Sequence, residues 1–236
     1  MSVVLAAQDL HTCYGRAQIL FGVSLNVMRG EVVVLLGRNG AGKSTTLKAL
    51  MNLVARTRGT IEFLGERIEH LPTHRIARLG LGYVPEERRV FGDLTVVQNL
   101  EVGRQPSRAG APTWTPERLF ELFPNLAGMR DRLGSRMSGG EQQMLSIART
   151  LMGNPACVLL DEPSEGLAPT IVDEMMETIR EMKMQGLSVL LSEQNLHFAQ
   201  QVADRAYIIE QGHIRYEGTM QALASDPVLA ADFLAV

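Results

Sequence analysis

Short apolar runs separated by polar and glycine-rich turns recur along the first part of the chain. Residues 23–27 alternate between apolar and polar side chains, which is the period of a half-buried strand. Residues 31–36 are almost continuously apolar, as expected for a strand that is covered on both faces. Further strands are expected at 60–64 and 81–84, with a short helix at 74–79 between them. Apart from a helix expected at 43–53, the first sixty residues are predicted to form strands and turns.

Helical patterns become more frequent further along the chain. Residues 43–53 lack proline and glycine and are predicted to form a helix. Thr95 with Gln98, and Ser138 with Glu141, each match the capping-box pattern, so helices are expected to begin there and to end near 102 and 151. The remaining predicted elements are strands at 158–160 and 189–191, helices at 171–183 and 196–202, and a closing hairpin at 206–210 and 213–217.

Strands that alternate with helices predict an α/β domain with a mostly parallel core sheet. One composition shift interrupts this order, at residues 103–116, where glycine, proline, serine and arginine surround Trp114. This segment is predicted to be an exposed loop inside a helical lobe. We expect a single domain over residues 1–236, with the helical lobe at about 87–153.

The composition narrows the functional classes. The chain has 236 residues, of which 45% are hydrophobic and 21% charged, with a formal net charge of -3. A general nucleic-acid binder is usually strongly basic, so no nucleic-acid partner is expected. The two cysteines, Cys13 and Cys157, show no metal spacing and no disulfide framework. No apolar run approaches the roughly 18 residues of a membrane span, so any membrane role requires a partner.

A glycine-rich segment with the pattern G-x-x-x-x-G-K-S follows the apolar run at 31–36. Its glycines let successive backbone N–H groups point at phosphate oxygens, its lysine reaches the β- and γ-phosphates, and its serine hydroxyl binds Mg²⁺. The alternative is a glycine-rich turn before a helix, but the position between a buried strand and a helix favours nucleotide binding. The candidate ATP-binding residues are Gly37, Arg38, Asn39, Gly40, Ala41, Gly42, Lys43, Ser44 and Thr45.

Two acids end the apolar run at 157–160. Asp161 and Glu162 are therefore expected at the carboxyl edge of the sheet, where open α/β sheets bind ligands. Asp161 is a candidate Mg²⁺ ligand, and Glu162 is the candidate catalytic base that polarises the attacking water. The alternative is a charged strand end with helix-capping acids. The phosphate-binding pattern upstream favours the catalytic interpretation.

Residues 137–143 read Met-Ser-Gly-Gly-Glu-Gln-Gln, and they lie between the phosphate-binding pattern and Asp161. This segment resembles the LSGGQ signature of the ABC ATPases, although a well-capped helix would explain Glu141 alone. The resemblance implies the ABC-ATPase form of the P-loop NTPase fold, with an antiparallel β part and an inserted helical lobe. It also implies ATP and Mg²⁺ as cofactors. Two cassettes then pair head to tail, and each signature faces the ATP held by its partner. The residues implied to face that ATP are Ser138, Gly139, Gly140 and Glu141.

The resemblance covers essentially the whole chain and assigns further residues. Tyr14 matches the aromatic residue that stacks on adenine, although it could also be an ordinary tyrosine at a strand end. Glu86 stands where a glutamine is common and is expected to reach Mg²⁺, together with Ser44 and Asp161. Gln194 replaces the usual switch histidine. It is expected to position the γ-phosphate without proton transfer. Ala168 stands where an aspartate is usual.

Four segments narrow the resemblance further. Residues 84–91, 93–96, 161–169 and 192–195 are similar to those of ATP-binding subunits of branched-chain amino acid importers, the hydrophobic amino acid uptake family, which has relatives for urea and aromatic acids. The implied partners are transmembrane permease subunits, a second ATP-binding subunit that is usually a paralogue, and indirectly a periplasmic solute-binding protein. The implied location is the cytoplasmic side of the inner membrane. The candidate permease contacts are Arg88, Arg89, Val90 and Phe91, although the two arginines could be solvated and Phe91 could be core.

Three other functions stay open at this point. An ABC ATPase of translation or DNA repair usually has two cassettes or a long coiled coil, and neither is found in this sequence. A catalytically weak cassette that only holds an assembly together is disfavoured by Glu162. It is kept open by Glu86, Ala168 and Gln194. An exporter subunit, for example one that moves lipid, shares the same motifs.

Overall fold

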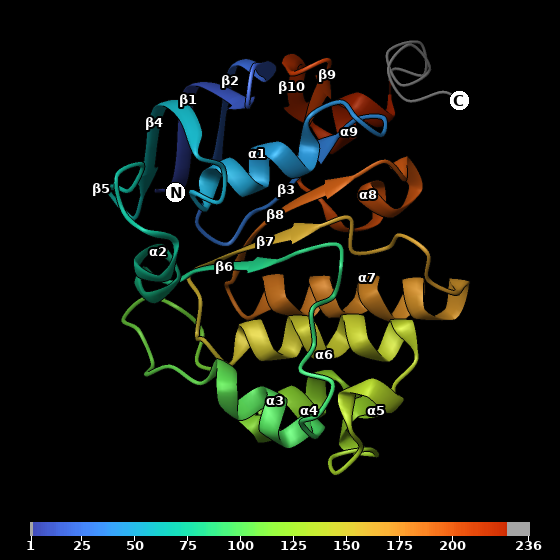
Figure 1. Ribbon diagram of the computed structural model, residues 1–236. Helices are drawn as coiled ribbons and strands as arrows, with labels where there is room; N and C mark the ends of the chain where they lie inside the picture. The colour runs from blue at the N-terminus through green and yellow to red at the C-terminus, as the bar shows by residue number, and fades with distance from the viewer. Residues whose placement is uncertain (1, 226–236) are drawn as a thin grey trace.

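A six-stranded sheet forms the centre of the protein in the computed structural model, which describes residues 2–225 (Figure 1). Neighbouring strands run parallel, except that β10 is antiparallel to β9. This confirms the mostly parallel core sheet that the alternation of strands and helices predicted. In order across the sheet, the strands are β10 (His213–Thr219), β9 (Arg205–Glu210), β3 (Val32–Leu36), β8 (Ser188–Glu193), β7 (Cys157–Asp161) and β6 (Leu81–Val84).

A second, antiparallel sheet covers one side of the central sheet (Figure 1). Its strands, in order, are β2 (Ala17–Met28), β1 (Val3–Tyr14), β4 (Arg56–Phe63) and β5 (Glu66–Arg67). Helix α1 (Lys43–Leu50) packs between the two sheets, and its Leu47 and Leu50 are fully buried there. This sheet is the antiparallel β part that the family resemblance implied.

The helices gather mainly on the other side of the central sheet. Figure 1 shows α6 (Gly139–Leu151) and α7 (Pro169–Met184) side by side beneath the sheet, with three shorter helices beyond them. The shorter elements of the chain are α2 (Thr73–Leu79), α3 (Val96–Gly103), α4 (Pro116–Leu122), α5 (Pro124–Ala127), the 3-10 helix η1 (Gly134–Arg136), α8 (Leu196–Val202) and α9 (Met220–Ala224). None of the helices within residues 2–225 has the length and apolar character needed to cross a membrane.

Strand β3 is continuously apolar because both of its faces are buried. Val32, Val34 and Leu36 belong to the hydrophobic cluster on the side of α6 and α7, whereas Val33 and Leu35 belong to the cluster under the antiparallel sheet. All five side chains are completely buried. Burial of each contributes on the order of 1.5–3 kcal/mol. Because both faces of the sheet are covered, the strand keeps a fixed position, and so does the loop at its carboxyl end.

Both predicted capping boxes are confirmed. The Gln98 N–H donates to the Thr95 hydroxyl at 3.2 Å, and the Thr95 N–H donates to the Gln98 side chain at 2.9 Å. The equivalent distances for Ser138 and Glu141 are 3.4 and 2.7 Å. These bonds satisfy N–H groups that a helix leaves unpaired at its first turn, so the beginnings of α3 and α6 follow directly from the sequence.

Helix α1 ends at Leu50, earlier than the predicted residue 53. Asn52 adopts a left-handed φ of 52°, which ends the helix. Its side-chain amide donates to three backbone carbonyls, those of Ile68, Glu69 and Leu71, at 3.1, 2.9 and 2.9 Å. These contacts come from residues distant in sequence. The absence of proline and glycine from residues 43–53 therefore did not reveal where the helix ends.

The predicted loop is present at residues 104–115, and most of its residues are exposed or half-buried, but the expected exposure of Trp114 is wrong. Trp114 is only 4% exposed and belongs to the main hydrophobic cluster. The segment is drawn inward by Asn154, whose side chain accepts a hydrogen bond from the backbone N–H of Trp114 at 2.6 Å and donates to the Gln105 carbonyl at 2.8 Å. Arg108 donates to the Asn154 carbonyl at 2.9 Å. A proline- and glycine-rich segment is therefore held against the end of α6 by Asn154 together with Arg108.

We expect Asn154→Ala to lower the free energy of unfolding by about 2–4 kcal/mol, because it removes both side-chain hydrogen bonds and places alanine at a left-handed φ of 49°. Trp114 is the sole tryptophan of the chain, so its fluorescence during urea unfolding reports the transition. Asn154→Gly is the matched control, since glycine removes the same bonds without the backbone strain. An alanine variant as stable as the parent would contradict this role.

Candidate nucleotide-binding site

The phosphate-binding segment connects the carboxyl end of β3 to the first turn of α1. Gly40 and Gly42 adopt φ angles of 80° and 114°, a region that side chains with a Cβ rarely enter. A Cβ on Gly37 would lie 2.5 Å from the carbonyl oxygen of Ile209 in the neighbouring strand β9. The glycines are therefore required by the curl of the loop and by its close approach to β9.

Lys43 lies at the centre of this segment and is only 3% exposed. Its ammonium group donates to the carbonyl oxygens of Gly37 at 2.8 Å and Arg38 at 3.1 Å. It also forms an ion pair of 3.1 Å with a carboxylate oxygen of Glu162, which is 6% exposed. The structure thus brings the predicted phosphate-binding lysine and the predicted catalytic base into direct contact.

The two acids occupy the carboxyl end of β7, as predicted. Asp161 is 1% exposed, and its two carboxylate oxygens accept hydrogen bonds from the Ser192 hydroxyl at 2.8 Å and the Tyr83 hydroxyl at 3.0 Å. Glu162 adopts a left-handed φ of 46°, and its N–H donates to Ser192. Burial, and then the negative charge of Asp161, raise the pKa of Tyr83. Asp161 is therefore held in one orientation by groups from the two neighbouring strands.

Tyr83 and Ser192 were not identified as part of the site from the sequence. Each lies near the end of a strand next to β7, and Ser192 pairs with Asp161 in the parallel register of β7 and β8. The sequence does show polar residues near the ends of three buried apolar strands. These residues could have been assigned to one site only if the order of the strands were known, and that order is set by contacts between distant parts of the chain.

The second carboxylate oxygen of Glu162 is buried and has no hydrogen-bond partner among the described residues. A buried carboxylate oxygen without a partner is costly, and it fits a group that orients a water molecule. Ser44 and the carboxylates of Asp161 and Glu86 offer oxygen atoms, which are the ligands that Mg²⁺ prefers. Ser44 is half-buried, and Glu86 is exposed two residues after the end of β6. The chemistry of these three oxygen donors suits a magnesium ion.

Glu165 is a further acid of this site that the sequence analysis did not single out. Its side chain is exposed beside Glu162. Hydrogen bonding of its protonated form to Glu162, followed by partial desolvation and the charges of Glu162 and Glu86, raises the pKa of Glu165 to about 7, against the opposing charge of Lys43. Glu193 is 1% exposed, and burial raises its pKa as well. Carboxylates therefore outnumber the one buried ammonium group around the end of β7.

The signature segment, residues 138–141, forms the N-terminus of α6. Its two glycines face Arg88 and Ile171 rather than the phosphate-binding loop. Ser138 is exposed, and Gly139 and Gly140 are half-buried. The backbone N–H groups at this helix start form an anion-binding arrangement on a separate part of the surface. One chain therefore does not bring this segment into contact with its own Lys43.

The remaining predicted residues lie at strand ends and helix starts. Tyr14 ends β1, and its ring is 48% exposed. Gln194 is exposed directly after β8, beside the buried Glu193. Arg38 and Asn39 are exposed in the phosphate-binding loop, and Thr45 is half-buried in α1. Ala168 is the N-cap residue of α7 and supplies no side-chain cap.

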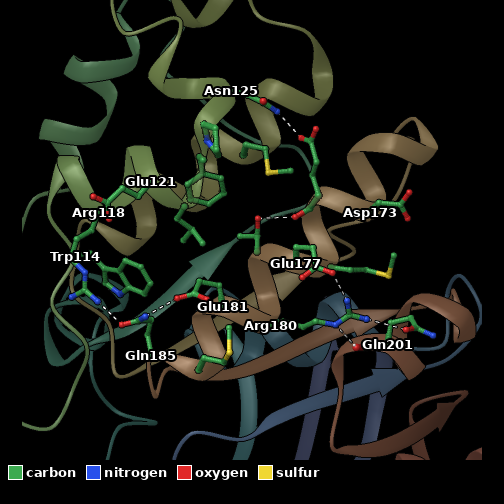
Figure 2. Close-up of a pocket in the computed structure, with 18 of the residues that line it drawn as sticks. Trp114, Arg118, Glu121, Asn125, Asp173, Glu177, Arg180, Glu181, Gln185 and Gln201 are labelled. Carbon is green, nitrogen blue, oxygen red and sulfur yellow. Dashed lines mark hydrogen bonds and ion pairs between the residues drawn. The ribbon is translucent and has the colours of Figure 1, made fainter.

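A groove of about 950 Å³ lies on another part of the surface, between helices α4 and α5 on one side and α7 and α8 on the other. Figure 2 shows Glu177 and Glu181 on α7, with Arg118 bonded to Gln185 at one end. None of the predicted ATP- or Mg²⁺-binding residues lines this groove. Its size therefore does not make it the site of the ATP chemistry.

We expect Glu165→Gln to make the ligand-free chain more stable than the parent at pH 8, and to lose most of that advantage at pH 5. A raised pKa means that the folded state binds a proton more tightly than the unfolded state, so stability falls as the pH rises from about 4.5 to about 7. Glutamine removes this dependence. The measurement is urea unfolding at both pH values, with Glu66→Gln on the exposed strand β5 as the control. Equal pH dependence in all three chains would refute the shared-proton contact.

The family model described as ABC transporter matches residues 20–165. The chain is 42% identical to the high-affinity branched-chain amino acid transport ATP-binding protein BraG of Pseudomonas aeruginosa over 98% of this chain and 99% of BraG. It is 38% identical to the lipopolysaccharide export system ATP-binding protein LptB of Haemophilus influenzae, with 94% and 93% covered.

A solved structure shows the same fold. The ADP conformation of MJ1267, an ATP-binding cassette of an ABC transporter, matches with a TM-score of 0.81 and 25% identity over 98% of both chains. The ABC-ATPase fold implied by the resemblance is thereby confirmed, and the matched segment includes the phosphate-binding loop, the signature segment and both acids. The chain belongs to the ABC transporter family and is one of its ATP-hydrolysing ATP-binding cassettes.

Proposed function

We propose that this chain is the ATP-hydrolysing subunit of an importer for branched-chain amino acids or chemically related amino acids. The observation that carries the hydrolytic part is the contact between Lys43 and Glu162, which joins the phosphate-binding loop to the candidate base. The cassette spans residues 1–236, and its helical lobe covers about 87–153. The relative BraG supports the amino-acid part, and no nucleic-acid partner is proposed.

In the proposed mechanism, the phosphate-binding loop binds the ATP phosphates and Glu162 activates the attacking water. In the nucleotide-free protein, the Lys43 ammonium is neutralised by Glu162 and by two loop carbonyls. ATP phosphates compete for this ammonium, because a phosphate oxygen carries more negative charge than a carbonyl. Glu162 is then left to orient water with its unpartnered oxygen and to accept the proton. Ser44, Asp161 and Glu86 would hold a Mg²⁺ ion, which would supply positive charge to the phosphates.

A second cassette completes the site. The signature segment lies at the start of α6, away from its own Lys43, so its N–H groups are available to a nucleotide on a facing subunit. The proposed arrangement is a head-to-tail dimer with a second ATP-binding subunit, a paralogue of this chain. Tyr14 stacks on the adenine, and Gln194 donates an amide N–H to the γ-phosphate. Gln194 does not act as an acid or a base in this mechanism.

The loop of residues 88–91 is the proposed contact for a cytoplasmic helix of the permease. Phe91 is 47% exposed, with the Arg149 guanidinium 4.9 Å from its ring centre, and the Arg89 side chain is 69% exposed. An exposed aromatic side chain next to cations is typical of a protein contact. The cassette is proposed to lie at the cytoplasmic side of the inner membrane through the permease, which in turn receives the amino acid from a periplasmic solute-binding protein.

Lipid export is the second candidate, because LptB is 38% identical to the chain. Import of amino acids is favoured by the higher identity to BraG and by residues 84–91, 161–169 and 192–195, which carry the resemblance to the hydrophobic amino acid uptake family. The permease and the solute-binding protein select the transported molecule. The cassette bears on the substrate only through the permease to which it docks.

We expect Glu162→Gln to lower the rate of Mg²⁺-dependent ATP hydrolysis by at least about a hundredfold, since a general base contributes roughly 10²–10⁴. The variant keeps the Lys43 contact as an amide and is expected to dimerise when ATP is added, as measured by size exclusion. The purified parent chain is the control. A variant that hydrolyses ATP like the parent would contradict the role of Glu162. If both chains are inactive and monomeric, adding the paralogous cassette tests whether a heterodimer is required.

The transported class is tested by replacement. We expect the chain to restore leucine uptake in Pseudomonas aeruginosa cells that lack BraG, because a cassette of the same importer group fits the same permease contact. Lys43→Ala, which removes the phosphate contact, is the matched variant and is expected to restore none. Rescue of Haemophilus influenzae cells depleted of LptB, without restored leucine uptake, would favour lipid export instead.

A further inference from the structure

Arg88 extends from the loop after β6 onto two glycines of different segments. A Cβ atom on Gly139 would lie 3.2 Å from the guanidinium carbon of Arg88, and one on Gly166 would lie 3.7 Å from its Nη2. Gly139 is the first residue of α6, in the signature segment. Gly166 lies in the loop between Glu162 and α7. The Arg88 guanidinium therefore fills the space between the signature segment and the loop that follows the catalytic base.

Packing, rather than charge pairing, holds this guanidinium. Within residues 2–225, the Arg88 side chain makes no hydrogen bond and no ion pair, whereas the adjacent Arg89 approaches Glu87 at 3.5 Å. Arg88 also lies at the positive end of α6, which is unfavourable for a cation by several tenths of a kcal/mol. Local electrostatics therefore do not explain the position, and the contact with the two glycines does.

The backbone is bent in a way that aims Arg88 inward. Arg88 and Arg89 adopt consecutive left-handed φ angles of 63° and 40°. Each costs on the order of 1–2 kcal/mol for a residue with a Cβ. The turn places Arg88 in a half-buried position and leaves the Arg89 side chain 69% exposed. Strain of this kind is maintained where the surroundings fix the conformation, most often at functional sites.

The same loop is also attached to the C-terminal part of α6. Arg149 donates to the Arg89 carbonyl at 2.8 Å, and its guanidinium lies 4.9 Å from the centre of the Phe91 ring. The loop thus contacts α6 near both of its ends, through Arg88 at Gly139 and through Arg149. A displacement of the loop is consequently transmitted to α6 as a whole, and not to its last turn alone.

We propose that Arg88 is a positioning residue that couples the signature segment to the loop after Glu162. The inference rests on the proposed head-to-tail function, in which the signature segment serves the nucleotide of the facing cassette and Glu162 serves the nucleotide of its own. A shift of Gly166 when ATP binds is passed through the Arg88 guanidinium to Gly139. The two nucleotide sites therefore respond to each other through one side chain that does not touch the substrate.

Hydrogen exchange of the full chain tests this coupling without a second cassette. A non-hydrolysable ATP analogue with Mg²⁺ is added at a concentration where the chain is monomeric, and exchange is followed in residues 139–142 and 164–168. The unsubstituted chain is expected to slow in both segments. Arg88→Ala is expected to keep the response at 164–168 and to reduce that at 139–142 by about fivefold or more, the lower end of ordinary coupling between sites. Its affinity for the analogue is expected to stay unchanged.

Matched variants separate coupling from charge and from folding. Arg136→Ala removes the same charge from an exposed arginine two residues before Ser138, and it is expected to behave as the parent. Arg88→Met keeps the apolar stem, which guards against misfolding, and it is expected to match Arg88→Ala. Arg88→Lys is expected to restore part of the response.

Three outcomes would overturn the proposal. These are an unchanged response at 139–142 in Arg88→Ala and Arg88→Met, an equal loss in Arg136→Ala, or no nucleotide response at 139–142 in the unsubstituted chain. None of them depends on hydrolysis. Failure of the coupling is therefore distinguishable from failure of the proposed function, which the Glu162→Gln comparison tests through its rate.

Discussion

A buried ion pair between the start of α1 and the residue after β7 is the constraint on which the site depends. Lys43 and Glu162 lie 3.1 Å apart with only 3% and 6% of their surfaces exposed. Removing such charges from water costs several kcal/mol for each ion, and the cost is offset only when the geometry is well maintained. That geometry requires β3 and β7 to keep their register with β8, the strand between them. The covered faces of the sheet supply this rigidity.

The parts of the fold that depend on neighbouring residues were predictable. The apolar runs of β3 and β7 indicate strands buried on both faces, because a one-sided strand would alternate. The capping boxes at Thr95 and Ser138 are four-residue patterns, and both are present in the structure. The phosphate-binding loop is recognisable for the same reason, since its glycines and lysine act within one turn of the chain.

The parts that depend on distant residues were not predictable. The segment around Trp114 has the composition of an exposed loop, yet Asn154 and Arg108 hold it against the core. The bonds from Tyr83 and Ser192 to Asp161 arise only once three strands lie side by side. Propensity and composition describe what a segment prefers alone. A few buried hydrogen bonds, each worth about 1 kcal/mol with a larger cost when broken, override that preference.

The charge balance around the end of β7 links the fold to the chemistry. Lys43 pairs with Glu162, and hydrogen bonding to Glu162, followed by partial desolvation and the negative charges of Glu162 and Glu86, raises the pKa of the nearby Glu165. A polyphosphate that approached alone would be attracted by the loop N–H groups and by the start of α1, but repelled by these carboxylates. A divalent cation bound with the phosphates removes the repulsion. In the proposed mechanism, the acids assigned to hydrolysis therefore also make nucleotide binding depend on the metal.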